Sequence, residues 1–209
     1  MSAITPPKLT YKPSVSQDII DKGVLSDVQL EAVSYAGQSH EQTLPDGSRR
    51  GFFIGDGTGV GKGREISGIL LDNFNKGRKK AVWVTVNEGL LSDTKRDIKA
   101  LFGNSDFVTQ FKGGSNATKS LSSDEGILFV GYDTLASQYN NPDSNLDKIV
   151  KWLGEDFDGV IAFDESHKMA NTGNTKGARG MKKASGRALA GIELQKRLPN
   201  AMILYASAT

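Results

Sequence analysis

Residues 54–64 combine a run of glycines with one lysine, in the order Ile-Gly-Asp-Gly-Thr-Gly-Val-Gly-Lys-Gly-Arg. The run follows a short apolar segment, residues 51–54, and precedes the helical pattern of residues 62–75. Glycines let a backbone take positive φ angles and approach a ligand closely, and successive N–H groups at the start of a helix bind phosphate oxygens. Lys62 adds a full positive charge. The predicted phosphate-binding residues are Gly57, Thr58, Gly59, Val60, Gly61, Lys62, Gly63 and Arg64.

Two positions of this loop depart from the usual phosphate-binding pattern. Gly63 follows the lysine, where a serine or threonine hydroxyl normally binds Mg²⁺, and Asp56 stands where a small residue is usual. We expect water to fill the place of the missing hydroxyl around the metal. A flexible glycine loop with an incidental lysine is the alternative interpretation. The combination of strand, Gly-Lys pair and helix favours phosphate binding.

A second group of reactive side chains follows the apolar run at residues 159–163. It reads Asp164, Glu165, Ser166 and His167. Open α/β sheets bind ligands beyond the carboxyl ends of their strands, so these acids are placed to complete a site for ATP and Mg²⁺. Asp164 is predicted to hold Mg²⁺ and Glu165 to act as general base toward the attacking water. The alternative is an ordinary acidic turn, with His167 hydrogen-bonded at the start of a loop.

The elements that would position these groups follow a repeating strand–helix pattern. Ser26 and Gln29 form a capping pattern that opens a helix, and further helices are predicted at 62–75 and 90–101. Near-continuous apolar runs that alternate with helices are typical of a parallel sheet covered on both faces, so we predict a three-layer α/β fold. The predicted strands are residues 51–54, 81–86, 127–130, 160–163 and 202–205. Residues 1–23 are expected to form an extended arm, and residues 24–209 one domain.

The bulk composition excludes several classes of protein. The 209 residues are 37% hydrophobic and 24% charged, with a formal net charge of +2, as in an ordinary globular protein. The absence of cysteine excludes disulfides and thiolate zinc sites, and the presence of only two histidines argues against an all-protein zinc site. The N-terminus lacks the pattern of a signal peptide, and no apolar run approaches the roughly 20 residues that span a bilayer. We expect an intracellular protein without a membrane segment.

The segment 168–187 carries six basic residues and no acid. It lacks apolar periodicity and is predicted to be a long loop. Two interpretations stay open: a loop that binds phosphates of a nucleic acid, and a solvated loop without a ligand. The basic residues are Lys168, Lys176, Arg179, Lys182, Lys183 and Arg187.

Together with smaller segments, the glycine loop and the acidic box resemble those of superfamily 2 helicases. Leu25-Ser26 with Gln29 resembles the upstream glutamine motif that reads adenine. Residues 84–87 and 132–135 lie where such proteins contact the nucleic-acid backbone, which implies this role for Thr85 and Thr134. The terminal Ser-Ala-Thr resembles the motif that couples hydrolysis to domain movement. The coupling residues implied there are Ser207 and Thr209.

The resemblance narrows to the strawberry notch family. It rests on the runs GFFIGDGTGVGKGREISGILLDNFNKGRKKAVWVTVNEGLLSDTKRDIKALFG, FDGVIAFDESHKMAN and LPNAMILYASAT. In that family the lysine loop also reads Gly-Val-Gly-Lys-Gly-Arg, so Gly63 fits this subgroup. The resemblance implies the first RecA-like domain of an ATPase that uses ATP and Mg²⁺. Its catalytic residues would be Lys62, Asp164, Glu165 and His167, and His167 could link the nucleotide and nucleic-acid sites.

The same resemblance implies partners beyond this chain. The sequence stops at the Ser-Ala-Thr motif, so we expect a second RecA-like domain outside it and a larger, multidomain protein. DNA or RNA would be contacted jointly with that domain. Animal members of the family are nuclear and linked to transcription, whereas bacterial and phage members occur in large proteins, some linked to defence against restriction. The sequence leaves these settings open.

Three functions compete. The leading hypothesis is a nucleic-acid-dependent ATPase, helicase or translocase. A small-molecule P-loop kinase is disfavoured by the Gln29 motif and the terminal Ser-Ala-Thr. The third is a P-loop module that serves as an interaction platform in a transcription-regulating or anti-restriction protein. Its expected signature, loss of Lys62 or Glu165, is not found.

Overall fold

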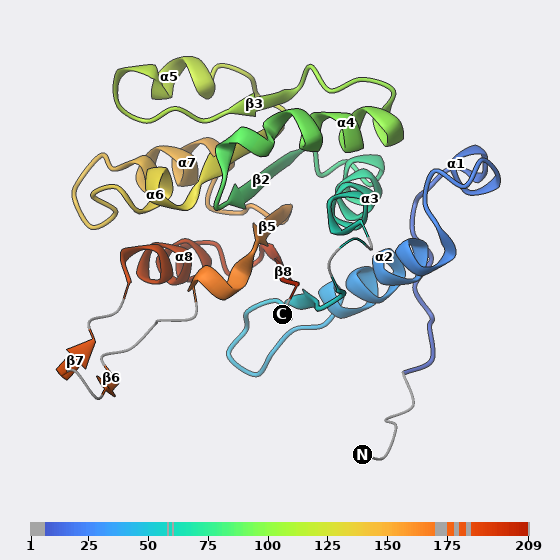
Figure 1. Ribbon diagram of the computed structural model, residues 1–209, viewed down its shortest axis with the longest axis horizontal. Helices are drawn as coiled ribbons and strands as arrows, with labels where there is room; N and C mark the ends of the chain where they lie inside the picture. The colour runs from blue at the N-terminus through green and yellow to red at the C-terminus, as the bar shows by residue number, and fades with distance from the viewer. Residues whose placement is uncertain are drawn as a thin grey trace.

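A six-stranded parallel sheet lies at the centre of the computed structural model (Figure 1). The structure describes residues 7–57, 59, 61–169, 175–177, 180–182 and 185–208. The strand order is β1-β8-β5-β2-β4-β3. The strands are β1 Phe52–Ile54, β2 Lys80–Thr85, β3 Val108–Gln110, β4 Gly126–Gly131, β5 Val160–Asp164 and β8 Met202–Ala206. The five predicted strands are confirmed; β3 was not predicted, because its residues Val-Thr-Gln include only one apolar side chain.

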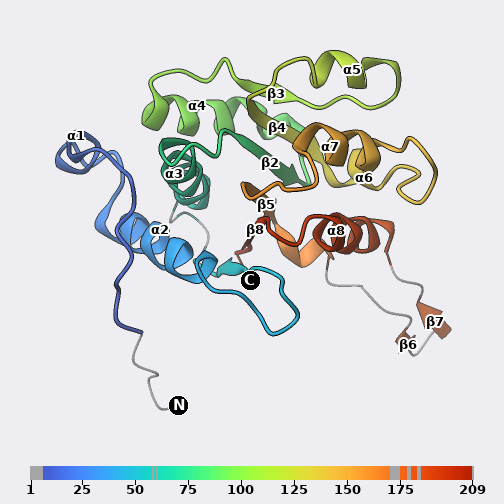
Figure 2. The same cartoon turned by 180° about the vertical axis from the view of Figure 1, so that it is seen from behind.

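Helices cover both faces of this sheet, which confirms the predicted three-layer α/β fold (Figures 1 and 2). Along β2, Val82 and Val84 pack on one face while Ala81 and Trp83 pack on the other. One face is covered by α2 Asp27–His40, α3 Lys62–Asn75 and α4 Leu91–Phe102. The other is covered by α5 Ala117–Ser120, α6 Tyr132–Ala136, α7 Asn145–Leu153 and α8 Gly186–Arg197. Burial of both faces explains why the strands read as near-continuous apolar runs.

Local capping signals fix several helix starts. Ser26 caps α2 through the predicted reciprocal bonds with Gln29, and α3 has the predicted bounds Lys62–Asn75. A second capping box, Ser144 with Asp147, starts α7. Short 3₁₀ turns lie at η1 Glu88–Leu90, η2 Gly114–Asn116 and η3 Ser166–Met169. No helix in the described ranges has the length and apolar character needed to cross a membrane.

The N-terminal segment is anchored to two helices. Residues 7–16 are extended, and a five-residue helix, α1 Gln17–Asp21, follows inside the stretch that we expected to be extended throughout. The ring of Tyr11 lies so close to Gly37 of α2 that any side chain there would overlap it. The Tyr11 hydroxyl donates to the buried carboxylate of Asp72 in α3, and the Ser14 N–H donates to the same carboxylate at 2.5 Å.

The segment 168–187 contains a small antiparallel hairpin, so its prediction as a loop is wrong in part. Strands β6 Thr175–Gly177 and β7 Gly180–Lys182 pair with each other and stand away from the body of the domain (Figure 1). The two strands read Thr-Lys-Gly and Gly-Met-Lys, which form no apolar run or alternation, so the sequence did not predict them. The basic residues Arg179 and Lys183 lie outside the described residues.

Candidate functional site

Strand register gathers three predicted segments at one edge of the sheet. Ile54 at the end of β1 pairs with Ala206 of β8, which pairs in turn with Asp164 of β5. The glycine loop, the Ser-Ala-Thr segment and the acidic box therefore leave the sheet from neighbouring carboxyl ends. This is the edge at which parallel α/β sheets bind ligands.

The glycine loop joins β1 to α3 in the geometry that its sequence predicts. Gly59 and Gly61 have φ angles of 90° and 91°, which favour glycine. The Nζ of Lys62 donates to the carbonyls of Asp56 and Gly57, both at 3.1 Å. The ammonium thus lies over its own loop, within reach of any group bound there. Thr58 and Val60 lie outside the described residues.

Gln29 lies against the glycine loop. Its Oε1 accepts from the Ser26 N–H at 3.1 Å, and its own N–H donates to the Ser26 hydroxyl at 3.3 Å. A Cβ on Gly61 would lie 2.7 Å from the Gln29 Nε2, so only glycine leaves room for the amide. The structure therefore brings together Gln29 and Gly61 of the glycine loop, which are 32 positions apart in the chain.

Gly63 and Arg64 face α4, which was not predicted. A Cβ on Gly63 would lie 2.6 Å from the Oδ2 of Asp97. Arg64 donates to the Oδ1 of Asp97 through Nη2 at 3.1 Å, and to the Val24 carbonyl through Nη1 at 3.0 Å. The Arg64 guanidinium is thus engaged between elements. The Cβ of any side chain at position 63 would be directed toward Asp97.

The acidic box ends β5. Burial raises the pKa of the Asp164 carboxyl, with the neighbouring charge of Glu165 acting in the same direction, while the charge of Lys62 opposes the shift. Glu165 has a φ of 52°, a left-handed conformation that is uncommon for a side-chain-bearing residue. The Tyr132 hydroxyl donates to the Asp164 carbonyl at 2.9 Å. This backbone is therefore held in an unusual turn that projects Glu165 from the strand end.

His167 connects the acidic box to the end of β8. Its Nδ1 lies 3.0 Å from the Ser207 Oγ and 3.2 Å from a Glu165 carboxylate oxygen. The Ser207 N–H donates to the Ile54 carbonyl at 3.0 Å, which ties the same segment to β1. Three of the predicted residues, Glu165, His167 and Ser207, are thus in direct contact. Thr209 lies outside the described residues.

The two predicted nucleic-acid contacts differ in their surroundings. Thr85 is 1% exposed and its Oγ1 accepts from the Asn87 N–H at 3.3 Å, so its side chain does not face solvent. Thr134 is partly exposed and donates to the Oε1 of Glu88 at 2.9 Å. Glu88 also accepts from the Gly131 N–H at 3.0 Å. It thereby ties the segment after β2 to the segment after β4.

Three acids near the site escaped the sequence prediction: Glu65, Glu88 and Asp97. Glu65 is fully buried in the first turn of α3, and neither carboxylate oxygen accepts a hydrogen bond from the part of the chain described here. Burial raises the pKa of Glu65 to about 7, with the nearby Asp56 carboxyl adding to the shift and Lys62 opposing it. The one sequence signal that could have identified Glu65 is its position as a charged residue beside the apolar stripe of a helix. Nothing in the sequence pairs Glu88 or Asp97 with a distant partner.

The protein offers few metal-binding groups at this site, so a metal ion there would be held mainly by a bound nucleotide. Across the described ranges, no cluster of three or more His, Cys, Asp or Glu side chains could hold a metal ion by itself. Asp164 supplies one carboxylate at the strand end, and Gly63 supplies no hydroxyl. Mg²⁺ is commonly bound by one or two carboxylates together with waters and substrate phosphates. These residues are compatible with Mg²⁺ bound together with a nucleotide.

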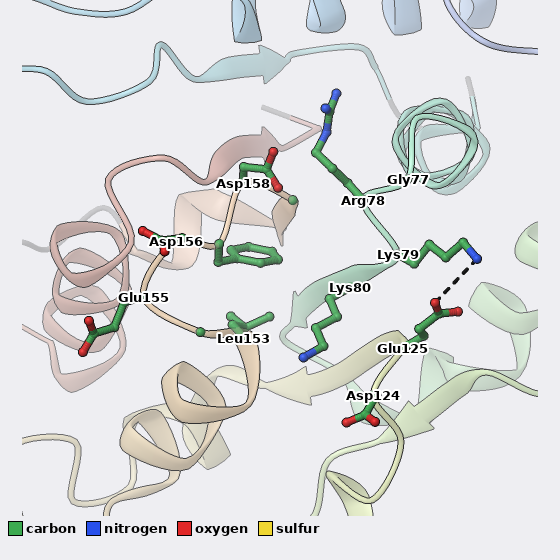
Figure 3. Close-up of a pocket in the computed structure, with 13 residues that line it drawn as sticks. Gly77, Arg78, Lys79, Lys80, Asp124, Glu125, Leu153, Glu155, Asp156 and Asp158 are labelled. Atoms are coloured by element: carbon green, nitrogen blue, oxygen red, sulfur yellow. Dashed lines mark ion pairs between the residues drawn. The ribbon is translucent and has the colours of Figure 1, made fainter.

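A cleft of about 440 Å³ lies at the opposite end of the sheet (Figure 3). It borders Lys80, the first residue of β2, and Gly159, which precedes β5. Charges of both signs line it, and the Lys79 ammonium pairs with Glu125 at 3.5 Å. Because ligands of parallel sheets bind at the carboxyl ends of the strands, this amino-terminal cleft is not the candidate nucleotide site.

Comparison with known proteins agrees with the geometry. A family model described as "P-loop containing NTP hydrolase pore-1" matches residues 1–209. "Protein strawberry notch homolog 1" of Gallus gallus is 43% identical over 216 residues, which cover 100% of this chain but 17% of that protein. The chain thus spans only a small part of its curated relative.

Solved structures share the fold at low sequence identity. The Sulfolobus solfataricus SWI2/SNF2 ATPase core in complex with dsDNA has a TM-score of 0.58 and 13% identity, covering 97% of this chain and 34% of that one. The Pyrococcus furiosus Hef helicase domain has a TM-score of 0.62 and 15% identity, covering 93% and 34%. These similarities confirm the predicted RecA-like domain.

Proposed function

Since this chain belongs to the strawberry notch family of P-loop NTP hydrolases, we propose that it binds ATP with Mg²⁺ as the first RecA-like domain of a nucleic-acid-dependent ATPase. The observation that carries the proposal is the strand register. It sets the loop of Lys62, the acids Asp164 and Glu165, and Ser207 at adjacent carboxyl ends. A phosphate-binding loop and an acidic box in this relation are the two halves of an ATP site.

The phosphates would lie in the glycine loop. The positive φ angles of Gly59 and Gly61 shape the loop, and Cβ atoms at Gly57 and Gly59 would meet open space, so a ligand can approach the backbone there. Lys62 would exchange its two carbonyl contacts for the β and γ phosphate oxygens. The exchange is favourable because a charge-assisted bond to an anion is stronger than one to a neutral carbonyl.

The acidic box would supply the metal ligand and the base. Asp164 would anchor Mg²⁺, directly or through water; when bound, the metal neutralises charge that develops on the phosphates. Glu165 would accept the proton of the attacking water. Its side chain is 38% exposed, so water can reach it, and His167 orients it from the side at 3.2 Å.

The proposal also includes contact with a nucleic acid, through residues of several separate segments. The surface would include the partly exposed Thr134, held by Glu88, together with the basic segment 168–187. For Thr85 the burial of the side chain favours an indirect role, through the backbone of the exposed residues that follow it. The Sulfolobus solfataricus ATPase core, which has the same fold, was solved with dsDNA. A second RecA-like domain, proposed to reside elsewhere in the longer protein, would complete the ATP cleft and supply its arginine fingers.

Calorimetric titration with MgATP tests the nucleotide site. Lys62→Ala should weaken ATP binding by roughly 10–100-fold, because a charge-assisted contact of about 1.5–3 kcal/mol is lost. Lys119→Ala, which removes an exposed lysine of α5, is the matched control and should bind ATP as the wild type does. Equal affinity of Lys62→Ala and wild type would refute the assigned phosphate site.

A further inference from the structure

The Arg64 side chain forms a junction between three segments of the chain. Its Nη1 donates to the Val24 carbonyl at 3.0 Å. Its Nη2 and Nε reach the Oδ1 of Asp97 at 3.1 and 3.4 Å. The two side chains are only 24% and 19% exposed, so this ion pair is partly shielded from water. The N–H groups of the Arg64 side chain therefore donate to Val24 and Asp97 and not to the adjacent glycine loop.

Each of the three joined segments belongs to a different part of the candidate site. Arg64 lies in the first turn of α3, directly after the phosphate loop. Val24 immediately precedes Leu25, which packs against Gly68 of α3, and it stands two residues before the cap of the helix that carries Gln29. Asp97 lies in α4, beyond the segment that follows β2. The guanidinium thus bridges the glutamine motif and α4 from the helix of the phosphate loop.

The same junction explains the unusual glycine after the lysine. The Oδ2 of Asp97 would lie 2.6 Å from any Cβ at position 63. A serine or threonine there would push the carboxylate away from Arg64. The glycine that removes the usual metal-binding hydroxyl is therefore also what lets Asp97 reach the guanidinium.

We propose, on the basis of the ATP site proposed above, that Arg64 is a positioning residue for recognition of the adenine base and not a ligand of the phosphates. By holding the Val24 carbonyl, it fixes the start of the helix that carries Gln29 against the helix that follows the glycine loop, and the Asp97 carboxylate holds the guanidinium in that position. A carboxamide can donate to and accept from the N7 and N6 edge of adenine, but it meets the wrong donor pattern on guanine. The discrimination between ATP and GTP depends on where that amide stands relative to the bound phosphates.

Lysine is the informative substitution at this position. Arg64→Lys keeps the positive charge but presents a point charge in place of the planar fork, so it cannot hold a carbonyl and a carboxylate on separate edges. Asp97→Asn removes the partner charge while keeping the shape of the side chain that faces Gly63. Arg96→Lys is the matched control, because Arg96 forms an exposed ion pair with Asp93 on the same helix at 2.9 Å.

Calorimetric titration of each protein with MgATP, MgGTP and inorganic tripolyphosphate tests the proposal. The affinity for tripolyphosphate measures binding to the phosphate loop alone, since tripolyphosphate carries no base. We expect Arg64→Lys and Asp97→Asn each to reduce the preference for ATP over GTP by about tenfold, the effect of one displaced hydrogen bond, while tripolyphosphate affinity stays at the wild-type value. Thermal melting of each variant confirms that the protein titrated is folded.

The titrations distinguish a failure of the role proposed for Arg64 from a failure of the ATP site. A fall in tripolyphosphate affinity for Arg64→Lys with an unchanged ATP-to-GTP ratio would make Arg64 a phosphate ligand and overturn the proposal. An unchanged ratio in both variants, or a wild type that does not prefer ATP, would overturn it as well. A wild type that binds neither nucleotide nor tripolyphosphate would instead overturn the ATP site itself.

Discussion

Replacing Glu65 with glutamine should stabilise the protein at alkaline pH and bring no comparable gain in acid. Glu65 is fully buried and neither of its oxygens accepts a hydrogen bond from the described residues, so its ionised form has lost its hydration, which the charge of Lys62 offsets only in part. Burial, reinforced by Asp56, raises its pKa from 4.5 to about 7. Glutamine has the same shape, carries no charge, and can donate its amide N–H to the Asp56 carboxylate.

The size and the pH window follow from the two pKa values. Between pH 4.5 and 7 the folded protein keeps a proton that the unfolded chain has released, so the free energy of unfolding of the wild type falls as the pH rises through this range. Above the folded-state pKa the penalty is constant. At 1.36 kcal/mol per unit, the shift corresponds to about 3 kcal/mol. The stability difference between Glu65→Gln and wild type should therefore grow by about 3 kcal/mol from pH 4.5 to pH 8.

Urea unfolding of both proteins at a series of pH values measures this difference. Glu155→Gln, at an exposed glutamate, is the control and should follow the wild-type curve across the range. Parallel curves for Glu65→Gln and wild type, with a constant offset at every pH, would refute the reasoning. They would mean that Glu65 titrates alike in the folded and unfolded chains.

Three further changes have defined expectations. Gly63→Ser should lower the urea midpoint, because the new side chain displaces Asp97, yet leave the Mg²⁺ dependence of ATP binding unchanged; a stronger dependence on Mg²⁺ in calorimetric titrations would show that the hydroxyl faces the metal after all. Glu165→Gln should retain ATP binding while hydrolysis by a longer protein with the second domain falls at least about 100-fold; steady-state turnover near the wild-type rate would exclude Glu165 as the base. Tyr11→Phe should cost about 1.5 kcal/mol of unfolding free energy, since the buried carboxylate in α3 loses a donor; an unchanged urea midpoint would show that this hydroxyl contributes no stability.

The sequence by itself determined those features that depend on neighbouring residues. The capping pair Ser26 and Gln29, the helix Lys62–Asn75 and the glycine loop before it could all be predicted, because each rests on hydrogen bonds or backbone angles within a few residues. The parallel sheet could also be predicted, since burial on both faces favours near-continuous apolar runs in the strands. Strand β3 could not, because its residues Val-Thr-Gln contain a single apolar side chain.

The tertiary structure alone decided where the side chains of the site point. Arg64 stands in a run predicted to bind phosphates, yet it faces Asp97 and Val24, and Thr85 stands in a segment predicted to contact nucleic acid, yet it is buried. Both outcomes depend on how a helix or strand end is rotated against neighbours that are distant in the chain. A residue's type and spacing specify which chemistry it can perform. Which partner it meets is set by the packing of the whole domain, and that information is spread over residues far apart in the sequence.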